Sequence, residues 1–270
     1  MSVVFRKAPL IEIIAELRWA APISFVMQNS SGRFTQHQPE QSSELLYNKF
    51  AGELAKEGFG MAERFVPPNV PLPPGAIALR FKETPKDEPT SSNLFQIGSG
   101  IFSANALPPY TSWHDFSPVV RKGVRALIRA GINTEAPIFN GLSLRYVNAF
   151  NASLIGDMRA HEFLVKILGF DMQPPEAISK RLLNANDFNP NLTFNFPVDD
   201  ESLLTMTVAE GIVQNERAIV MDMNITYTQK PIAVEEDEIM SRFLRSREII
   251  HDIFISITHK LHNQMAPSKP

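Results

Sequence analysis

The chain has 270 residues, with 26 Lys and Arg against 29 Asp and Glu, 44% hydrophobic residues and no cysteine. This length allows one large domain or two of about 130 residues, and the formal net charge of −3 argues against a generally basic nucleic-acid-binding protein. The lack of cysteine excludes disulfides, thiol nucleophiles and thiolate metal sites, and because no apolar run approaches about 18 residues we expect a soluble, cytoplasmic protein without membrane contact.

The first predicted elements are a strand, a loop and a helix. In residues 8–19 apolar residues alternate with polar ones, which predicts a strand with one apolar face. The polar stretch 29–43 is typical of a loop. Ser42 or Ser43 is expected to cap a helix that ends near Glu57, where a glycine follows.

Three strands and a second helix complete the first half. Short apolar segments between Pro-rich and polar turns predict strands at residues 62–66, 76–82 and 94–103. Ser112, with Asp115 three residues later, forms a capping box, so we expect a helix from this point to Gly131. Its inward stripe consists of Trp113, Phe116, Val120, Val124, Leu127 and Ile128.

The pattern then restarts. Residues 136–148 predict a strand and residues 159–168 a short helix. Alternation predicts three more strands, at residues 192–196, 203–208 and 218–228. A long helix is expected from about Glu236 to His262, and residues 266–270 form a disordered tail. The apolar stripe of the long helix consists of Met240, Phe243, Leu244, Ile250, Ile253, Phe254, Ile257 and Leu261.

Each half therefore reads β-α-β-β-β-α, and the two halves start alike, at Ala8-Pro9 and Ala136-Pro137. We predict an α+β fold of two similar halves, residues 1–133 and residues 134–265. In it, a curved antiparallel sheet grips long helices, as in the TATA-binding-protein and helix-grip architectures. The alternative is that two ordinary amphipathic strands merely start alike.

A Leu-Arg-aromatic triplet occurs three times in the predicted strands. In each triplet, alternation sends the apolar pair to the helix side of the sheet and the arginine to the opposite face. The candidate interaction residues on that face are Glu12, Glu16, Arg18, Arg80, Arg145 and Asp222. Two interpretations stay open: a solvated face with cross-strand ion pairs, or a binding surface whose mixed charges suit a protein partner.

The helix that follows Ser112 carries a basic stripe on its polar side. This candidate basic face consists of Arg121, Lys122, Arg125 and Arg129. It is the best candidate for contact with nucleic acid, yet it has only four charges and no evident exposed aromatic residues for base stacking. An ordinary solvated helix face is the favoured interpretation.

Motifs that carry catalysis or cofactor binding are missing. Neither a phosphate-binding loop nor a nucleophile elbow occurs, and Gly98-Ser99-Gly100 lies inside a predicted strand. The pairs His114-Asp115 and His251-Asp252 lack the helical scaffold of a metal-dependent phosphohydrolase. His259 and His262 fit a solvated helix end better than a metal site. We expect no cofactor and no metal, and a protein without enzymatic activity is favoured over an enzyme with an unrecognised site.

The alternative function is the binding of a small apolar ligand in a cavity between the sheet and the long helix. The lining would be Met221, Met223, Phe194, Phe243 and Phe254. A packed core accounts for the same residues.

Motifs along nearly the whole chain resemble an uncharacterised bacterial family described as sporadically distributed. The family's segments aP-I-x-E-x-x-x-E-L-R, Y-x-x-W-x-D-F, L-R-Y-I-N and a C-terminal H-x-x-I-x-x-x-F-like helix followed by I-T are recognisable here. The matching residues are Ala8, Pro9, Leu10, Glu12, Glu16, Leu17, Arg18, Tyr110, Trp113, Asp115, Phe116, Leu144, Arg145, Tyr146, Val147, Asn148, His251, Phe254, Ile257 and Thr258. Leu10 and Val147 replace the usual Ile, and Ala149 stands where a basic residue is common.

The resemblance implies that the gene moves between bacteria and says nothing of the protein's biochemical activity. A patchy distribution is typical of mobile-element, toxin–antitoxin or phage-defence loci. We therefore predict a non-enzymatic protein-interaction factor. It would serve as an accessory, antitoxin or phage-defence component of a mobile bacterial locus, with another protein as its partner.

Overall fold

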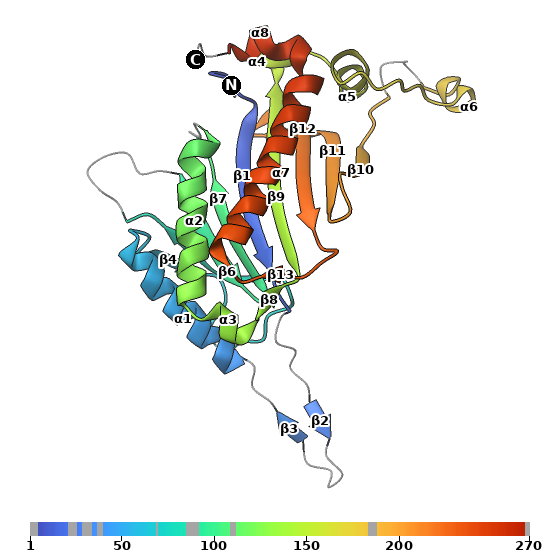
Figure 1. The fold of residues 1–270 in the computed structure, drawn as a ribbon. Coiled ribbons are helices and arrows are strands. Elements are labelled where there is room, and N and C mark those ends of the chain that lie inside the picture. The colour runs from blue at the N-terminus through green and yellow to red at the C-terminus, as the bar shows by residue number, and fades with distance from the viewer. Residues whose placement is uncertain are drawn as a thin grey trace. The chain divides into compact units, whose positions relative to one another are not determined.

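The structure is a computed structural model that describes residues 5–20, 26–28, 34–36, 40–68, 70–84, 92–108, 112–182 and 188–267 (Figure 1). Tyr110, the first residue of the Y-x-x-W-x-D-F segment, lies outside the described residues. Within them, no helix is both long and apolar enough to cross a membrane.

The dominant element is a nine-stranded antiparallel sheet, whose hydrogen-bonded order is β10-β11-β12-β9-β1-β7-β6-β5-β4. Its strands are β1 (Leu10–Arg18), β4 (Met61–Arg64), β5 (Ile77–Lys82), β6 (Asn93–Gly98), β7 (Ile101–Ala106), β9 (Gly141–Asn151), β10 (Leu192–Pro197), β11 (Ser202–Val213) and β12 (Glu216–Tyr227). Two small pairs join β2 (Val26–Gln28) to β3 (Phe34–Gln36) and β8 (Ile138–Phe139) to β13 (Ile232–Ala233). The α+β class and the large antiparallel sheet are confirmed.

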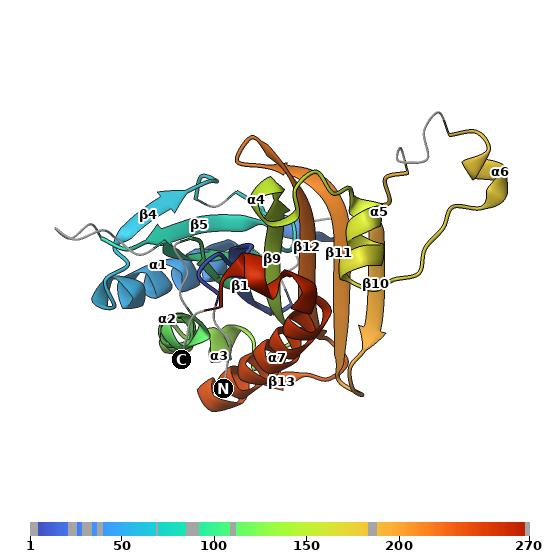
Figure 2. The same ribbon diagram turned by 90° about the horizontal axis from the view of Figure 1, so that it is seen from above.

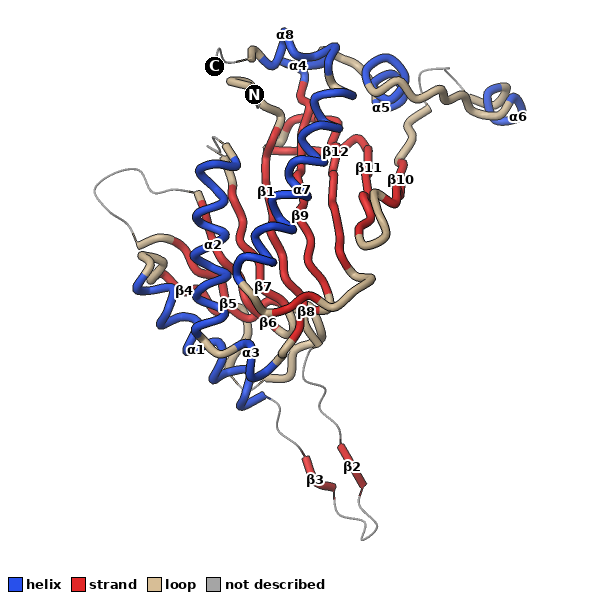
Figure 3. The backbone as a smooth tube through the Cα atoms, in the orientation of Figure 1, coloured by secondary structure: helices blue, strands red, loops and turns tan. Residues whose placement is uncertain are grey.

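The long helices occur where the apolar periodicity predicts them (Figure 3). The helices are α1 (Glu40–Lys56), α2 (Trp113–Arg129), α3 (Ile132–Glu135), α4 (Ala152–Ile155), α5 (Ala160–Glu162), α6 (Glu176–Ser179), α7 (Glu236–Ile257) and α8 (His262–Met265). A π-helical turn, Phe163–Ile167, continues α5, and a 3₁₀ turn, His259–Leu261, precedes α8.

The chain divides into two compact units. Unit 1 comprises Met1–Ile13, Leu144–Thr226 and Arg245–Pro270, and unit 2 comprises Ile14–Ser143 and Tyr227–Leu244. The boundaries fall within β1, β9, β12 and α7, so these units differ from the two sequence halves 1–133 and 134–265.

In unit 2, aromatic side chains attach two helices to one face of the sheet. Phe50 of α1 packs edge-on against Phe81 of β5 and Phe102 of β7, with ring centroids 5.6 and 5.7 Å away. Gly123 of α2 approaches so closely that a Cβ there would stand 2.4 Å from the ring of Phe95. Because these four rings are buried, α1 and α2 cover the same face of β5–β7 (Figure 2).

Helix α2 begins and ends as its sequence predicts. The Ser112 hydroxyl accepts a hydrogen bond from the Asp115 N–H at 3.3 Å and donates one to the Asp115 carboxylate at 2.7 Å. At the other end, Gly131 adopts a φ of 96°, which favours glycine. Five of the six residues of its predicted inward stripe are buried, and Ile128 is half-buried.

The predicted strand 94–103 is wrong, since this segment forms the hairpin of β6 and β7. Gly98 and Ile101 face each other, and Ser99-Gly100 makes the turn with Gly100 at a φ of 71°. A Cβ on Gly98 would lie 1.9 Å from the Ala76 carbonyl oxygen, so glycine is required there. The alternation of apolar and polar residues did not predict the turn, because apolar residues lie on both sides of it.

The predicted strand 136–148 is also divided. Residues 138–139 form β8, and after Asn140, whose N–H donates to the Arg18 carbonyl at 2.9 Å, β9 begins and runs to Asn151. Strands β11 and β12 extend beyond the predicted 203–208 and 218–228 segments toward each other. Gln214 and Asn215, at φ values of 52° and 65°, form the two-residue turn between them.

In unit 1, Phe150 of β9 is the centre of the contact between sheet and helices. Its ring centroid lies 4.8 Å from that of Phe163 in the π-helical turn and 6.5 Å from that of Phe254 in α7. Met221 and Met223 of β12 are fully buried on the same side. These residues form a packed core.

Helix α7 ends before the predicted His262. The Thr258 N–H and hydroxyl both donate to the Phe254 carbonyl, at 3.0 and 2.6 Å, and the chain tightens into the 3₁₀ turn. Leu244, predicted inward, is 46% exposed because its neighbour Phe243 takes the inward position, and Ser246 is buried instead.

The C-terminal segment, predicted as a disordered tail, contacts the start of the chain. The Arg6 N–H donates to the Ala266 carbonyl at 3.0 Å, and Phe5 forms a β-bridge with Pro267. Residues 268–270 lie outside the described residues.

Two glycines in helices test the packing of unit 2. Gly123→Ala should lower the free energy of unfolding by about 1–3 kcal/mol, because the new methyl group collides with two rings. Gly52→Ala in α1, where nothing lies within 4 Å of a Cβ, should raise it by about 0.5–1 kcal/mol. Urea denaturation of both variants measures the difference; equal stabilisation by both would contradict the close approach of α2 to the sheet.

Candidate functional site

In each unit, the sheet face opposite the helices is here called the outer face, and alternation along the strands assigns the predicted interaction residues to it. In unit 2, the Arg18 Nε of β1 donates to the Glu16 carboxylate at 2.6 Å, two residues earlier on the same strand. Glu12, also on β1, belongs to unit 1, is half-buried and has interactions of its own. These predicted side chains are therefore engaged within the chain.

Arg80 lies in a polar row across unit 2. The strand register sets Glu63 opposite Arg80, Arg80 opposite Gln96 and Gln96 opposite Ser103. Arg80 Nη1 donates to Glu63 Oε2 at 3.4 Å, and its guanidinium carbon lies 4.8 Å from the ring centroid of Phe65. Arg80 is thus held by a long ion pair and a cation–π contact.

Arg145 and Asp222 form the best-defined pair of the outer face. Arg145 lies on β9 and Asp222 on the neighbouring β12, and Arg145 Nε donates to both carboxylate oxygens, at 2.8 and 2.9 Å. Arg145 Nη2 adds a further short bond to Oδ2. The Arg145 side chain is 45% exposed, so the pair presents one cation and one anion at the surface of unit 1.

Threonine and asparagine side chains form cross-strand pairs on β10 and β11, the strands beyond β12, and were not among the predicted site residues. The Thr193 and Thr207 hydroxyls are 3.1 Å apart, and the Thr205 hydroxyl donates to Asn195 Oδ1 at 2.9 Å. Thr193 and Asn195 are exposed and belong to β10, whereas Thr205 and Thr207 belong to β11. The signal in the sequence is the alternation of short polar residues with Leu, Phe and Met on both strands.

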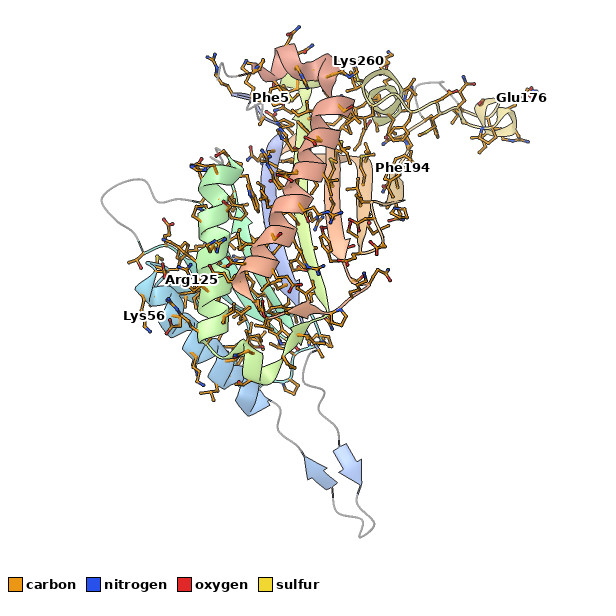
Figure 4. All side chains as sticks on the ribbon, viewed as in Figure 1. Phe5, Lys56, Arg125, Glu176, Phe194 and Lys260 are labelled. Carbon is orange, nitrogen blue, oxygen red and sulfur yellow. The ribbon has the colours of Figure 1, made fainter. Side chains whose placement is uncertain are left out.

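The candidate basic face on α2 is largely neutralised. Arg121 Nη1 donates to Glu236 Oε1 at 2.6 Å and to Asp237 at 3.0 Å, and Arg125, labelled on α2 in Figure 4, donates to both Glu236 oxygens, at 2.9 and 2.8 Å. Lys122 lies 3.8 Å from a carboxylate oxygen of Glu57. Arg129 is exposed, with no ion pair to any residue the structure describes. These contacts join α2 to the N-terminus of α7.

Glu236 is the most strongly perturbed carboxylate of this cluster. The hydrogen bond from Arg125 has the largest effect on the pKa of Glu236; burial opposes it, and with the added hydrogen bond from Arg121 and the charges of both arginines the pKa falls to about 2. As the first residue of α7, Glu236 also lies where a negative charge is favoured by the helix dipole.

The histidines do not form a shared site. The ring Nδ1 of His259 lies 2.9 Å from the Ser256 carbonyl oxygen, and Nε2 of His262 lies 3.1 Å from that of Ile255. Burial, then the charge of Arg247, lowers the pKa of His251. Across the described ranges, no three His, Cys, Asp or Glu residues are grouped so that they could hold a metal ion.

Glu210 forms an ion-pair cluster that sequence reasoning missed. Its Oε1 accepts from Arg159 Nε at 2.7 Å and from the Ala160 N–H at 3.0 Å, and Arg217 lies 3.6 Å away. Although burial raises the pKa of Glu210, these donors outweigh it and lower the pKa below its usual value. The cluster anchors α5 to β11; the residues are too far apart in the chain for spacing to reveal it.

The residues proposed to line a ligand cavity lie in packed surroundings. Met221, Met223 and Phe243 are fully buried. Phe194 stacks on Phe170 with centroids 4.5 Å apart, and Phe254 packs against Phe150. These contacts and this burial fit a packed core.

Comparison with protein-family models, curated proteins and solved structures finds no match to this chain. The family resemblance seen in the sequence motifs stays a prediction.

The Glu236 cluster predicts a specific acid sensitivity. Since the pKa is lower in the folded state than the ordinary 4.5, the ion pairs stabilise the protein fully above that pH, and this contribution is lost as the pH falls toward 2. At neutral pH, Glu236→Gln should lower the free energy of unfolding by about 1–2 kcal/mol. The difference from the unsubstituted protein should shrink between pH 4.5 and 2 in denaturant titrations.

Asp237→Asn is the matched control, because the Asp237 side chain is 94% exposed and shares Arg121 with Glu236. Its unfolding free energy should stay within about 0.5 kcal/mol of the unsubstituted protein. A loss as large as that of Glu236→Gln would contradict the assignment of the stabilisation to Glu236.

Proposed function

We propose that this protein is a non-enzymatic interaction factor that binds another protein through the outer face of β9–β12 in unit 1. The observation that carries the proposal is the partly exposed Arg145–Asp222 pair on β9 and β12, with threonine and asparagine pairs on the next strands, β11 and β10. Such a surface offers donors, acceptors and both signs of charge. Its partner would be a polar protein surface of complementary charge.

Nucleic acid fits this face less well than protein. A phosphate backbone is bound by cations that have no carboxylate beside them. Arg145 is neutralised by Asp222, and on α2 the guanidinium groups of Arg121 and Arg125 both bond to Glu236. The formal net charge of −3 points the same way.

The biological setting that we propose follows from the family resemblance. A component of a mobile bacterial locus, as an accessory, antitoxin or phage-defence factor, would act by holding a second protein of the same locus. A binding face without catalytic machinery suits that role. Fold alone does not assign it, so the partner has to be found by experiment.

We also propose that the fold arose by internal duplication, in an arrangement like that of TATA-binding-protein or helix-grip folds. The strand order supports this, because β1 and β9 are neighbours and the later strands of each half follow outward on either side. The first half contributes β7, β6, β5 and β4, and the second contributes β12, β11 and β10.

The proposed face is tested by exchanging the two charges of its central pair. The double variant Arg145→Asp with Asp222→Arg keeps an ion pair and the net charge, but it reverses the charge pattern shown to a partner. We expect thermal unfolding to be nearly unchanged and recovery of the partner in affinity capture from the native host to fall at least tenfold. The single variant Arg145→Asp, which sets two carboxylates side by side, should be destabilised.

The matched control exchanges a pair away from the sheet, Glu176→Lys with Lys180→Glu on α6, whose side chains are 80% and 70% exposed. It should leave the captured proteins unchanged. Undiminished capture by the Arg145/Asp222 exchange would refute the proposed face.

A further inference from the structure

Strand β10 is an edge of the sheet, and it lacks the charged residues that usually protect such an edge. It ends the strand order, and its sequence, LTFNFP, has no charged residue. The strand at the opposite end, β4, has the sequence MAER, and its Arg64 pairs with Glu44 at 2.9 Å. Charges and prolines on an edge discourage pairing with another strand; on β10, only the terminal Pro197 is of this kind.

The backbone groups free at this edge follow from the pairing with β11. The Val198 N–H donates to the Ser202 carbonyl at 3.0 Å, and the same register sets Phe196 opposite Leu204 and Phe194 opposite Met206. In an antiparallel pair, hydrogen-bonded residues alternate with residues that direct both backbone groups away from the partner strand. Even-numbered residues of β10 therefore bond to β11, and Thr193 and Asn195 direct N–H and C=O outward.

We propose that β10 pairs antiparallel with β10 of a second copy of this chain, about a two-fold axis that passes through Phe194. In this register Thr193 lies opposite Asn195 of the second copy. Each of these two symmetry-related pairs exchanges two N–H···O=C bonds, so four backbone bonds join the chains. An axis through Asn195 would set Thr193 opposite Pro197, which has no N–H.

The side chains match in the same register. On the helix side, Phe194 meets its own copy and Leu192 meets Phe196, whose side chain is 42% exposed in the single chain. Phe194 and Phe196 already stack, with centroids 6.0 Å apart, and Figure 4 shows Phe194 at this edge of unit 1. On the outer face, Thr193 meets Asn195, which extends the polar rows of β10 and β11 across the junction. No like charges meet within the strand.

The hydrogen-bond pattern also fixes the direction of the axis. Because outward-directed residues must lie opposite each other, Thr193 and Asn195 meet on the same face, and the axis is perpendicular to the sheet. The outer faces of the two copies then form one continuous surface. The dimer does not depend on what that surface binds.

Asn195→Pro tests the dimer, because it removes an outward N–H from each copy and leaves the backbone bonds to β11 intact, with the loss of only the side-chain bond from Thr205. In sedimentation equilibrium over a concentration series, the unsubstituted protein should approach twice the 30.3 kDa of one chain, and Asn195→Pro should stay at 30.3 kDa. Asn195→Thr, which keeps the N–H and a polar side chain, should still dimerise. A monomer at every concentration for the unsubstituted protein, even one that binds a strand of another protein, overturns the proposal.

A second test addresses the register and uses the absence of native cysteine. In the double variant Thr193→Cys with Asn195→Cys, the opposed Cα atoms would be about 5.5 Å apart, within reach of a disulfide. Mild oxidation should link most chains into dimers. In either single variant the symmetry-related positions are diagonal, about 7–8 Å apart, and should link at least tenfold more slowly. Equal linking of single and double variants, or none in the double, overturns the register.

Discussion

In each of the two units, the part of the structure that is described depends on helices that cover one face of the sheet. In unit 2 the Phe50 ring attaches α1 to β5 and β7, and in unit 1 the Phe150 ring lies between β9 and two helical segments. Strand residues alternate between the two faces. The residues that point away from the helices must therefore find hydrogen-bond partners on neighbouring strands or in solvent. Pairs such as Arg145–Asp222 and Thr193–Thr207 result from that constraint.

An open sheet also has two edges, and the two differ in character. Strand β4 has four residues, two of them charged, whereas β10 has six, none of them charged. Unpaired N–H and C=O groups on a neutral, aromatic strand are a liability for a protein that stays monomeric. In the proposed dimer these N–H and C=O groups form hydrogen bonds with β10 of the second copy, in a register that uses every outward N–H donor of the strand.

Periodicity predicted the faces of strands well and their ends less well. Along β12, Ile219, Met221 and Met223 are buried as predicted, because each lies two residues from the next on the covered face. The turn at Ser99-Gly100 was missed, since apolar residues continue on both sides and only the backbone approach of Ala76 to Gly98 reveals it. Helix α2 was predicted to both ends because local hydrogen bonds and one glycine define them.

Partner choice among charged residues could not be predicted, because it depends on contacts distant in sequence. Arg121 and Glu236 are 115 residues apart, and Arg145 and Asp222 are 77 apart. The sequence predicted on which helix or sheet face each of the two arginines lies. It did not predict their carboxylate partners, which decide whether each arginine joins two helices or stays partly exposed at the surface. Two guanidinium groups and a helix N-terminus share the Glu236 carboxylate, which holds α2 to α7.

Arg145, by contrast, bonds to Asp222 with its side chain 45% exposed. An ion pair that is half exposed can exchange its partner for one on another protein at a small cost in free energy, because surface pairs contribute little to folding. A carboxylate shared by two arginines cannot be released so easily. These differences in pairing are why we propose the sheet face, rather than the basic helix, as the surface that recognises a partner.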